Sequence, residues 1–138
     1  MKHAATDPTP DSAHEAAFIT AFVIPDKRSR YSDFLSNPKR RSEILNRLNH
    51  FFDFVPECTI PIPRSSSVQF ARILRARGAT PLAYVIGGNN DTCQLPLEEA
   101  IESALASGFG TIVSCIPGRL ALYLQEFPSG DAFILSRQ

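Results

Sequence analysis

A cysteine and an arginine near the C-terminus are the first pair of residues that could do chemistry. Cys115 precedes a Pro-Gly turn that ends in Arg119. A cysteine-phosphatase loop places five residues between its nucleophile and its arginine, around phosphate at a helix N-terminus that lowers the pKa of the thiol. Only three residues separate Cys115 from Arg119, and a strand-like segment follows. We therefore expect Cys115 to lie in the core, because free cysteine packs as a small hydrophobe.

The spacing of the potential metal ligands does not favour a metal site. A structural zinc site normally includes a close ligand pair, and the chain has neither Cys-x-x-Cys nor two histidines at helical spacing. Any site would have to gather residues that are far apart in the chain: Cys58, Cys93, Cys115 and His50. We expect no metal and no cofactor.

The loop at residues 87–92, Gly-Gly-Asn-Asn-Asp-Thr, lies between a predicted strand and a predicted helix. Open α/β sheets often bind ligands at such a position. Glu98 and Glu99 at the start of that helix would repel phosphate, and the chain has no Walker-type glycine–lysine loop. A plain turn is the favoured interpretation. The alternatives are a neutral or cationic small ligand, or an enzyme site near residues 87–94 that uses Asn89, Asn90, Asp91 and Arg119.

Basic side chains are concentrated in the middle of the chain. Residues 26–78 hold eleven Lys or Arg against five Asp or Glu, whereas residues 79–138 hold two against six. Residues 26–51 combine seven cations with a tyrosine that could stack on a base: Lys27, Arg28, Arg30, Lys39, Arg40, Arg41, Arg47 and Tyr31. Nucleic-acid binding through this segment is therefore an alternative function. Interleaved acidic residues and a net charge of zero favour ordinary solvated helix faces.

Capping residues and hydrophobic periodicity predict five helices that would position these side chains. Ser12 and Glu15 have capping-box spacing, Asn37 is a good cap before a first-turn proline, and Gly78 and Gly108 are stop signals. The predicted helices are 12–23, 26–35, 37–51, 66–76 and a last one from Leu97 to Gly108. Residues 81–86 predict a buried strand. The proline-rich residues 53–65 predict an extended connection with room for one short edge strand.

Residues 109–137 predict three strands joined by two tight turns, at Pro117–Gly118 and at Phe127–Gly130. The expected cross-strand pairs are Cys115–Leu120, Val113–Leu122, Thr111–Leu124, Leu124–Phe133 and Leu122–Leu135. One face is then a core face of Val113, Cys115, Leu120, Leu122, Leu124, Phe133 and Leu135. The opposite face is too apolar to be left in solvent: Ile112, Ser114, Ile116, Arg119, Ala121, Tyr123, Gln125, Ala132 and Ile134.

These elements predict an α+β fold. A crossover from the strand at 81–86 through the last helix, with the meander added, gives a mixed sheet of four to five strands. The helical N-terminal half would cover the face that carries Ile112, Ile116, Tyr123 and Ile134, and the last helix would cover the leucine face. A three-layer α/β/α arrangement is the alternative. We expect a disordered tail at residues 1–11 and a single domain at residues 12–138.

Composition places the chain among ordinary globular domains. It has 138 residues, 43% of them hydrophobic and 20% charged. No stretch has the length or apolar character of a signal sequence or of a membrane-spanning helix. Three widely spaced cysteines suit a reducing compartment, so we expect a cytoplasmic location. We expect no membrane partner.

The leading functional hypothesis is a small, non-catalytic binding or regulatory protein. It rests on the lack of a catalytic motif together with a second sheet face that is partly apolar. The partner is expected to be another protein, which would contact Arg119 and Tyr123 on that face or the basic residues of 26–51. Nucleic acid and an enzyme site are the alternatives given above, and the oligomeric state is left open.

Overall fold

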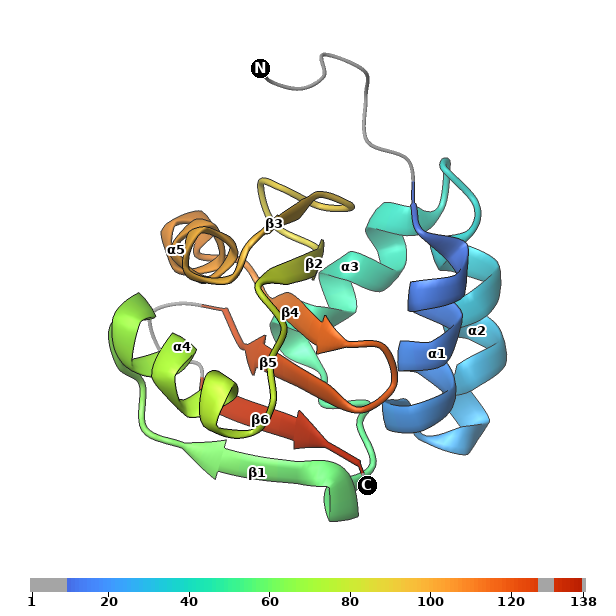
Figure 1. Ribbon diagram of the computed structural model, residues 1–138. Helices are drawn as coiled ribbons and strands as arrows, with labels where there is room; N and C mark the ends of the chain where they lie inside the picture. The colour runs from blue at the N-terminus through green and yellow to red at the C-terminus, as the bar shows by residue number, and fades with distance from the viewer. Residues whose placement is uncertain (1–9, 127–130, 138) are drawn as a thin grey trace.

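A computed structural model of the chain describes residues 10–126 and 131–137 (Figure 1). The helices in these residues are α1 (Ser12–Phe22), α2 (Pro25–Leu35), α3 (Arg41–His50), α4 (Ser67–Ala76) and α5 (Leu97–Ser107). The strands are β1 (Thr59–Ile62), β2 (Leu82–Ile86), β3 (Gln94–Pro96), β4 (Thr111–Ile116), β5 (Leu120–Leu124) and β6 (Ala132–Ser136). Within the described ranges, no helix has the length and apolar character needed to cross a membrane.

The six strands form one sheet in the order β1-β6-β5-β4-β2-β3. Each neighbouring pair is antiparallel. The predicted α+β class and the C-terminal meander are confirmed, as is the short edge strand within the proline-rich connection, which is β1. The sheet has six strands rather than four or five, and the prediction that it is mixed is wrong.

The predicted crossover is wrong because the chain turns back before α5 begins. β3 pairs with β2, so that Ala83 lies opposite Leu95, and β4 pairs with the other edge of β2, so that Val85 lies opposite Val113. The helix α5 therefore connects β3 to β4, with β2 between them. A strand of three residues that ends in Pro96 has no alternating hydrophobic pattern, and this is why it was missed.

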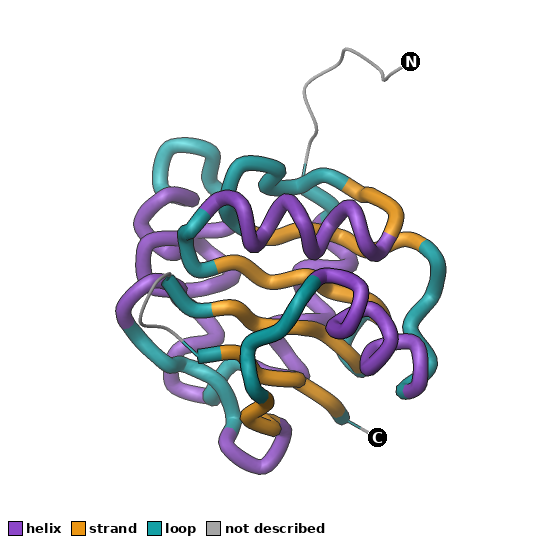
Figure 2. Tube along the Cα trace, turned by 90° about the vertical axis from the view of Figure 1, so that its left-hand side faces the viewer, coloured by secondary structure: helices purple, strands orange, loops and turns teal. Residues whose placement is uncertain are grey.

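Helices cover both faces of the sheet (Figures 1 and 2). The apolar side chains of α1, α2 and α3 form one buried cluster with one face, and those of α4 and α5 form a second cluster with the other. The layers thus follow the three-layer alternative, although the sheet is antiparallel. α4 was expected beside the other N-terminal helices and instead packs with α5.

Local sequence accounts for where most helices begin and end. The N-cap of α1 is Asp11, not Ser12, because the Asp11 carboxylate accepts the backbone N–H of His14 over 3.0 Å. Ser66 caps α4 by accepting from the backbone N–H of Gln69, and α5 ends at Gly108 with a φ of +76°. α3 begins at Arg41, later than predicted, because the residues after Asn37 form a turn whose N–H groups bond to Asn37.

The first turn of the meander has three residues instead of two or four. Thr111 lies opposite Leu124 and Val113 opposite Leu122, as predicted, but a bulge then makes Ile116 the partner of Leu120. Gly118 has a φ of +71°, the conformation that the third position of a type II turn requires, and the N–H of Arg119 closes this turn by donating to the Ile116 carbonyl over 2.9 Å. Cys115 is therefore not paired with Leu120, yet it is buried in the cluster of α4 and α5.

The predicted register between the last two strands is wrong by one residue. Leu124 lies opposite Ala132 and Leu122 opposite Ile134, instead of Phe133 and Leu135. The turn predicted at 127–130 lies outside the described residues, but the backbone N–H of Gln125 donates to the carbonyl of Asp131, which leaves an odd number of residues between them. Because side chains alternate, this slip exchanges the faces of all five residues of β6.

The sheet face that looked unfinished in the sequence is covered. Ile112, Ala121 and Tyr123 are buried under α1, α2 and α3, together with Leu135 from the corrected register. Ile134 is buried on the opposite face, and Ile116 packs there as well. No site can therefore lie on this sheet face, and a functional surface has to be sought where the helices and loops meet.

Candidate functional site

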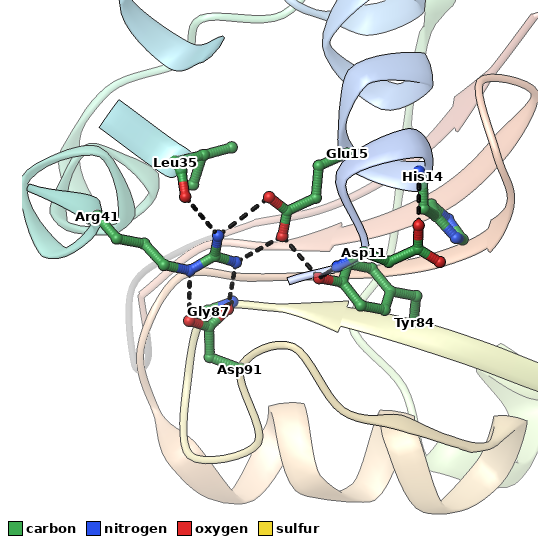
Figure 3. A network of polar contacts seen from close by, with 8 residues as sticks. All are labelled: Asp11, His14, Glu15, Leu35, Arg41, Tyr84, Gly87 and Asp91. Atoms are coloured by element: carbon green, nitrogen blue, oxygen red, sulfur yellow. Dashed lines mark hydrogen bonds and ion pairs between the residues drawn. The ribbon is translucent and has the colours of Figure 1, made fainter. Parts of the chain in front are cut away.

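The strongest concentration of polar groups in the interior surrounds Arg41, the first residue of α3 (Figure 3). Its guanidinium lies between the carboxylate of Glu15 on α1 and the carboxylate of Asp91 in the loop after β2. It makes two hydrogen bonds to each, of 2.7 and 3.0 Å to Glu15 and of 2.7 and 2.8 Å to Asp91. The exposed fractions of the three side chains are 9% for Arg41, 5% for Glu15 and 22% for Asp91.

The hydrogen-bond capacity of Arg41 is fully used inside the protein. A guanidinium has five N–H donors. Four of them are taken by the two carboxylates, and the fifth is donated to the carbonyl of Leu35 over 3.0 Å. Burial disfavours the charged guanidinium, but the hydrogen bonds that Arg41 donates to Asp91 and Glu15 outweigh it and raise the pKa of Arg41 above its ordinary value. Arg41 therefore stays charged and has no donor left for a ligand.

Tyr84 on β2 extends the network to the sheet. Its hydroxyl donates to Glu15 Oε2 over 2.7 Å and accepts the backbone N–H of Asp11 over 2.9 Å. Burial and the hydrogen bond to Glu15 raise the pKa of Tyr84, so the hydroxyl stays protonated. The network thus ties the start of α1 to β2.

His14 and Ser114 form a buried pair beside Tyr84. His14 Nε2 and Ser114 Oγ are 2.6 Å apart and share a hydrogen bond, and the imidazole stacks on the Tyr84 ring at 4.9 Å. Burial lowers the pKa of His14, although Asp11 and Glu15 nearby act to raise it. A serine beside a neutral histidine suggests a nucleophile and its base. Ser114 is completely buried within the sheet, however, so no substrate can reach its hydroxyl, and the pair is structural.

The loop after β2 has the backbone needed to aim Asp91 at Arg41. Gly87 and Gly88 adopt φ values of +95° and +69°, and the N–H of Gly87 donates to Asp91 Oδ1 over 2.8 Å. Thr92 has a φ of +70° and is the one non-glycine residue of the described ranges with a positive φ. A β-branched residue in this conformation is strained, and such strain often marks a functional site.

A pocket of about 610 Å³ opens beside this network. It lies between α1, α2 and the loop, and it is lined by Pro10, Ser12, Glu15, Ala16, Ile19, Ser32, Leu35, Ser36, Pro38, Arg41, Asp91 and Thr92. The volume is within the range of small-molecule sites, which are mostly apolar with a few fixed polar groups. One guanidinium against two carboxylates leaves a formal charge of −1 at its polar end.

Two oxygens of these carboxylates can each accept another hydrogen bond. Each carboxylate offers about four lone-pair positions. From the described residues, Glu15 Oε2 and Asp91 Oδ1 each accept two hydrogen bonds, whereas Glu15 Oε1 and Asp91 Oδ2 each accept one, both from Arg41. Those two oxygens can accept a further donor, so the site can bind a cation or a neutral donor and disfavours an anion.

Of the three loop residues predicted to hold a small ligand, Asp91 lines the pocket. Asn90 instead bonds to Ser103 on α5, and Asn89 is exposed away from the pocket lining. The sequence placed Arg41 and Asp91 in separate candidate sites, and the fold brings them together. Glu15 was not among the candidates. The sequence could have indicated Glu15 by its spacing, because Phe18 and Ile19 follow it by three and four residues. This spacing puts the Glu15 carboxylate on the buried stripe of α1.

Most of the basic residues predicted as a binding surface have partners within the protein. Arg28 donates to the Val23 carbonyl, and Arg40 pairs with Glu43 and stacks on Phe34. Arg47 makes two hydrogen bonds to Asp53, of 2.8 and 3.0 Å. The remaining three are Arg30, which lies over the Phe34 ring, half-buried Lys27 and exposed Lys39.

The two tyrosines predicted as contact residues are buried. Tyr31 donates to Asp53 Oδ2 over 2.7 Å in the core, so it cannot stack on a base. Burial acts to raise the pKa of Asp53, but the hydrogen bonds from Arg47 and Tyr31 outweigh it and lower that pKa. Tyr123 lies under Phe52 and Phe54 and donates to the Leu48 carbonyl. Arg119, in contrast, is exposed at the β4–β5 turn.

The thiols and histidines of the described part form no metal site. No group of three or more potential ligands comes together among the described side chains, which do not include that of His50. None of the three cysteines, all of them described, is in a disulfide, and burial raises the pKa of the Cys115 thiol to about 12. This is the reverse of what a nucleophilic thiol needs.

The arrangement can therefore hold a small donor-bearing molecule, and its described groups do not form a nucleophile, base and oxyanion site together. No protein-family model matches this chain, and no curated protein or solved structure matches it either.

Proposed function

We propose that the protein is a non-catalytic binding protein whose pocket beside Arg41 takes a small molecule with one positively charged nitrogen and an apolar body. The observation that carries the proposal is the saturated Arg41 guanidinium between two carboxylates. It leaves Glu15 Oε1 and Asp91 Oδ2 as acceptors and a formal charge of −1 at the polar end of the pocket.

The walls of the pocket fit the apolar part of such a ligand. Ala16 and Ile19 from α1 face Leu35 and Pro38 across the opening. An ammonium or guanidinium group would donate to the two carboxylates, and hydrogen bonds to charged groups contribute about 1.5–3 kcal/mol each. The strain at Thr92, which also lines the pocket, is consistent with a backbone held in place for binding.

Thermal unfolding with matched ligands tests the charge preference. Alkyl amines, alcohols and carboxylates with the same carbon skeleton should be compared at fixed ionic strength. We expect the amines to raise the melting temperature in a saturable way and the carboxylates to have no effect, because a ligand stabilises the state that it binds. Equal effects of amines and carboxylates would contradict the proposal.

A variant that fills the pocket without changing a residue of the Arg41 network tests whether the amine binds in this pocket. Ala16→Leu adds bulk at an exposed wall position of α1, where leucine is a good helix former. We expect it to abolish the amine effect and to leave the fold intact by circular dichroism. Ala13→Leu, on the same helix but outside the pocket lining, is the matched control and should bind as the wild type does.

Docking of another protein is the second candidate function, and a cluster of exposed aromatic side chains favours it. Phe51, Phe52 and Phe109 have exposed fractions of 50%, 40% and 53%. The N–H of Gly110 bonds to the Asn49 side chain, which brings Phe109 beside the end of α3. Exposed apolar groups gathered in one place are typical of interaction sites.

Co-purification with point variants distinguishes this candidate from the first. A partner that docks on the aromatic cluster should be lost from the double variant Phe51→Ser/Phe109→Ser and retained by Val68→Ser, which changes an exposed apolar residue on α4. Ala16→Leu should not affect it. We place either function in the cytoplasm, because three cysteines without a disulfide suit a reducing compartment.

Nucleic-acid binding through residues 26–51 stays a prediction with less support than before. Three of its seven cations, Arg40, Arg41 and Arg47, already pair with carboxylates, which leaves fewer to neutralise phosphates. Filter binding at several salt concentrations tests it, since binding to phosphates weakens steeply as salt increases.

A further inference from the structure

A second group of charged residues lies away from the Arg41 network, where the end of α4, the β4–β5 turn and the end of β6 meet. Its pocket of about 540 Å³ is lined by Arg77, Ile116, Arg119, Leu120, Ser136 and Arg137. A neighbouring hollow of about 530 Å³ shares Arg119 and Arg137 and is walled by the small residues of α1. Three arginines thus line two neighbouring hollows, and Arg119 and Arg137 belong to both.

The fold holds these three arginines near one another by fixed backbone contacts. The backbone N–H of Arg137 donates to the carbonyl of Arg119 over 2.9 Å, next to the paired residues Leu120 and Ser136. Arg77 follows α4, and a Cβ at the adjacent Gly78 would lie 4.0 Å from the Ile116 side chain. The end of α4 therefore abuts the end of β4, beside the turn that carries Arg119.

The two arginines within α4 itself, Arg72 and Arg75, have side-chain partners. Arg75 pairs with Glu98, and Arg72 donates to Gln69, both on the surface of α4 and its neighbours. Arg137 uses Nη1 to donate to the Ala21 carbonyl over 3.2 Å and to Cys58 Sγ over 3.7 Å. Among the described residues, no carboxylate lies within 4.0 Å of the guanidinium of Arg77, Arg119 or Arg137, and none lines either hollow.

Like charges that converge without a counter-charge repel one another and attract an anion into the space between them. The C-terminal end of α4 favours one cation, Arg77, through the helix dipole, but it does not account for Arg119 and Arg137. The planar guanidinium group is suited to phosphate because its N–H groups match two oxygens at once. The Ser136 hydroxyl is a further polar group at the same surface.

The geometry points to an anion-binding pocket at Arg77, Arg119 and Arg137 that takes the phosphate group of a small molecule. A phosphate dianion matches three cations better than a single carboxylate does. The pocket lined by Arg77, Arg119 and Arg137 shares no lining residue with the pocket beside Arg41, and binding there requires no bond to be made or broken. Free inorganic phosphate and a phosphate monoester share the chemistry, and the experiment separates them.

Isothermal titration of the full chain with inorganic phosphate, phenyl phosphate and acetate, at fixed ionic strength, tests the site. We expect saturable binding of phosphate or its monoester and much weaker binding of acetate. Phosphate bound in preference to phenyl phosphate would identify free phosphate as the ligand, whereas equal or tighter binding of phenyl phosphate would identify a monoester. No saturable binding of either at millimolar concentration would overturn the proposal.

Charge-removing variants locate the anion. Arg77→Gln and Arg119→Gln should each weaken phosphate binding by about tenfold, because each removes a charge-assisted interaction. Both residues are exposed, so the variants should fold, which circular dichroism checks. Arg72→Gln is the matched control from the same helix and should bind within about twofold of the wild type.

Two results would assign the arginines a different role. If Arg72→Gln weakens binding as much as Arg77→Gln does, phosphate responds to general surface charge and the proposed pocket is wrong. If only single-stranded RNA binds, with a steep salt dependence that Arg119→Gln reduces, the arginines contact a nucleic-acid backbone and the small-molecule site is also wrong.

Discussion

The guanidinium of Arg41 and the carboxylate of Glu15 are 26 positions apart in the chain and are joined by hydrogen bonds of 2.7 and 3.0 Å in the protein interior. Asp91, another 50 positions beyond Arg41, completes the arrangement. Three distant segments therefore depend on one side chain. The removal of that side chain leaves two carboxylates near each other without their counter-charge.

Arg41→Ala should lower the free energy of unfolding by about 3–5 kcal/mol, the cost of leaving a buried charge without its partner. Urea denaturation followed by circular dichroism measures this loss. Arg40→Ala is the neighbouring control. Its side chain is 49% exposed in a pair with Glu43, and exposed pairs contribute at most about 1 kcal/mol. Similar losses in the two variants would contradict the interior role of Arg41.

Gly110→Ala should be far more damaging than Gly108→Ala. A Cβ on Gly110 would lie 2.2 Å from the carbonyl oxygen of Leu48, a backbone atom that cannot move aside cheaply. Overpacking of this kind costs about 1–3 kcal/mol or more. Gly108 has a φ of +76° but open space around its Cβ position, so alanine there meets only backbone strain of about 1 kcal/mol. Thermal unfolding of both variants makes the comparison.

Cys115 should resist alkylation in the native protein and react after denaturation. The thiol is buried and its pKa is raised to about 12, so little thiolate forms at pH 8. Iodoacetamide labelling followed by peptide mass spectrometry measures each cysteine separately. Half-buried Cys93 is the internal comparison and should react earlier. Rapid native labelling of Cys115 would show that the strand end opens to solvent.

The stability of the protein should decrease as the pH falls below about 6.5, in part because of His14. Burial lowers the folded-state pKa of His14 below the ordinary value of 6.5, so between these two pKa values the unfolded chain binds more protons than the folded one. The contribution is complete above pH 6.5 and is lost as the pH falls through the folded-state pKa. The neighbouring charged groups Asp11 and Glu15 moderate this shift.

Urea denaturation between pH 7.5 and 5 compares the wild type with His14→Gln. Glutamine can still bond to Ser114 but does not titrate, so the variant should show a weaker dependence of unfolding free energy on pH. Identical slopes for the two proteins would exclude His14 as the cause.

The helices were predictable because their signals are local. Ser66, Gly78 and Gly108 mark helix ends within a few residues of the observed ones, and a proline at the start of α2 agrees with its position. The first half of the β4–β5 register was predictable for the same reason. A short turn and alternating side chains are enough to pair Val113 with Leu122.

What could not be predicted depends on contacts between distant segments. The β5–β6 register slipped because one extra residue between the strands exchanges their faces, and composition does not reveal that residue. Arg41 belongs to a run of basic residues that looks like any exposed helix face. Its burial follows from the positions of α1 and the loop around Asp91, which local periodicity does not specify.

The order of the strands also limits how a partner can bind. The two edge strands of the sheet are β1 and β3. β1 has four residues and contains Pro61, and β3 has three residues and ends in Pro96. Proline lacks the N–H that a neighbouring strand would need, and short edge strands offer few backbone groups for hydrogen bonds to another strand. The protein is thereby protected from edge-to-edge aggregation. A protein partner would have to recognise side chains, since the addition of a strand to this sheet is disfavoured at both ends.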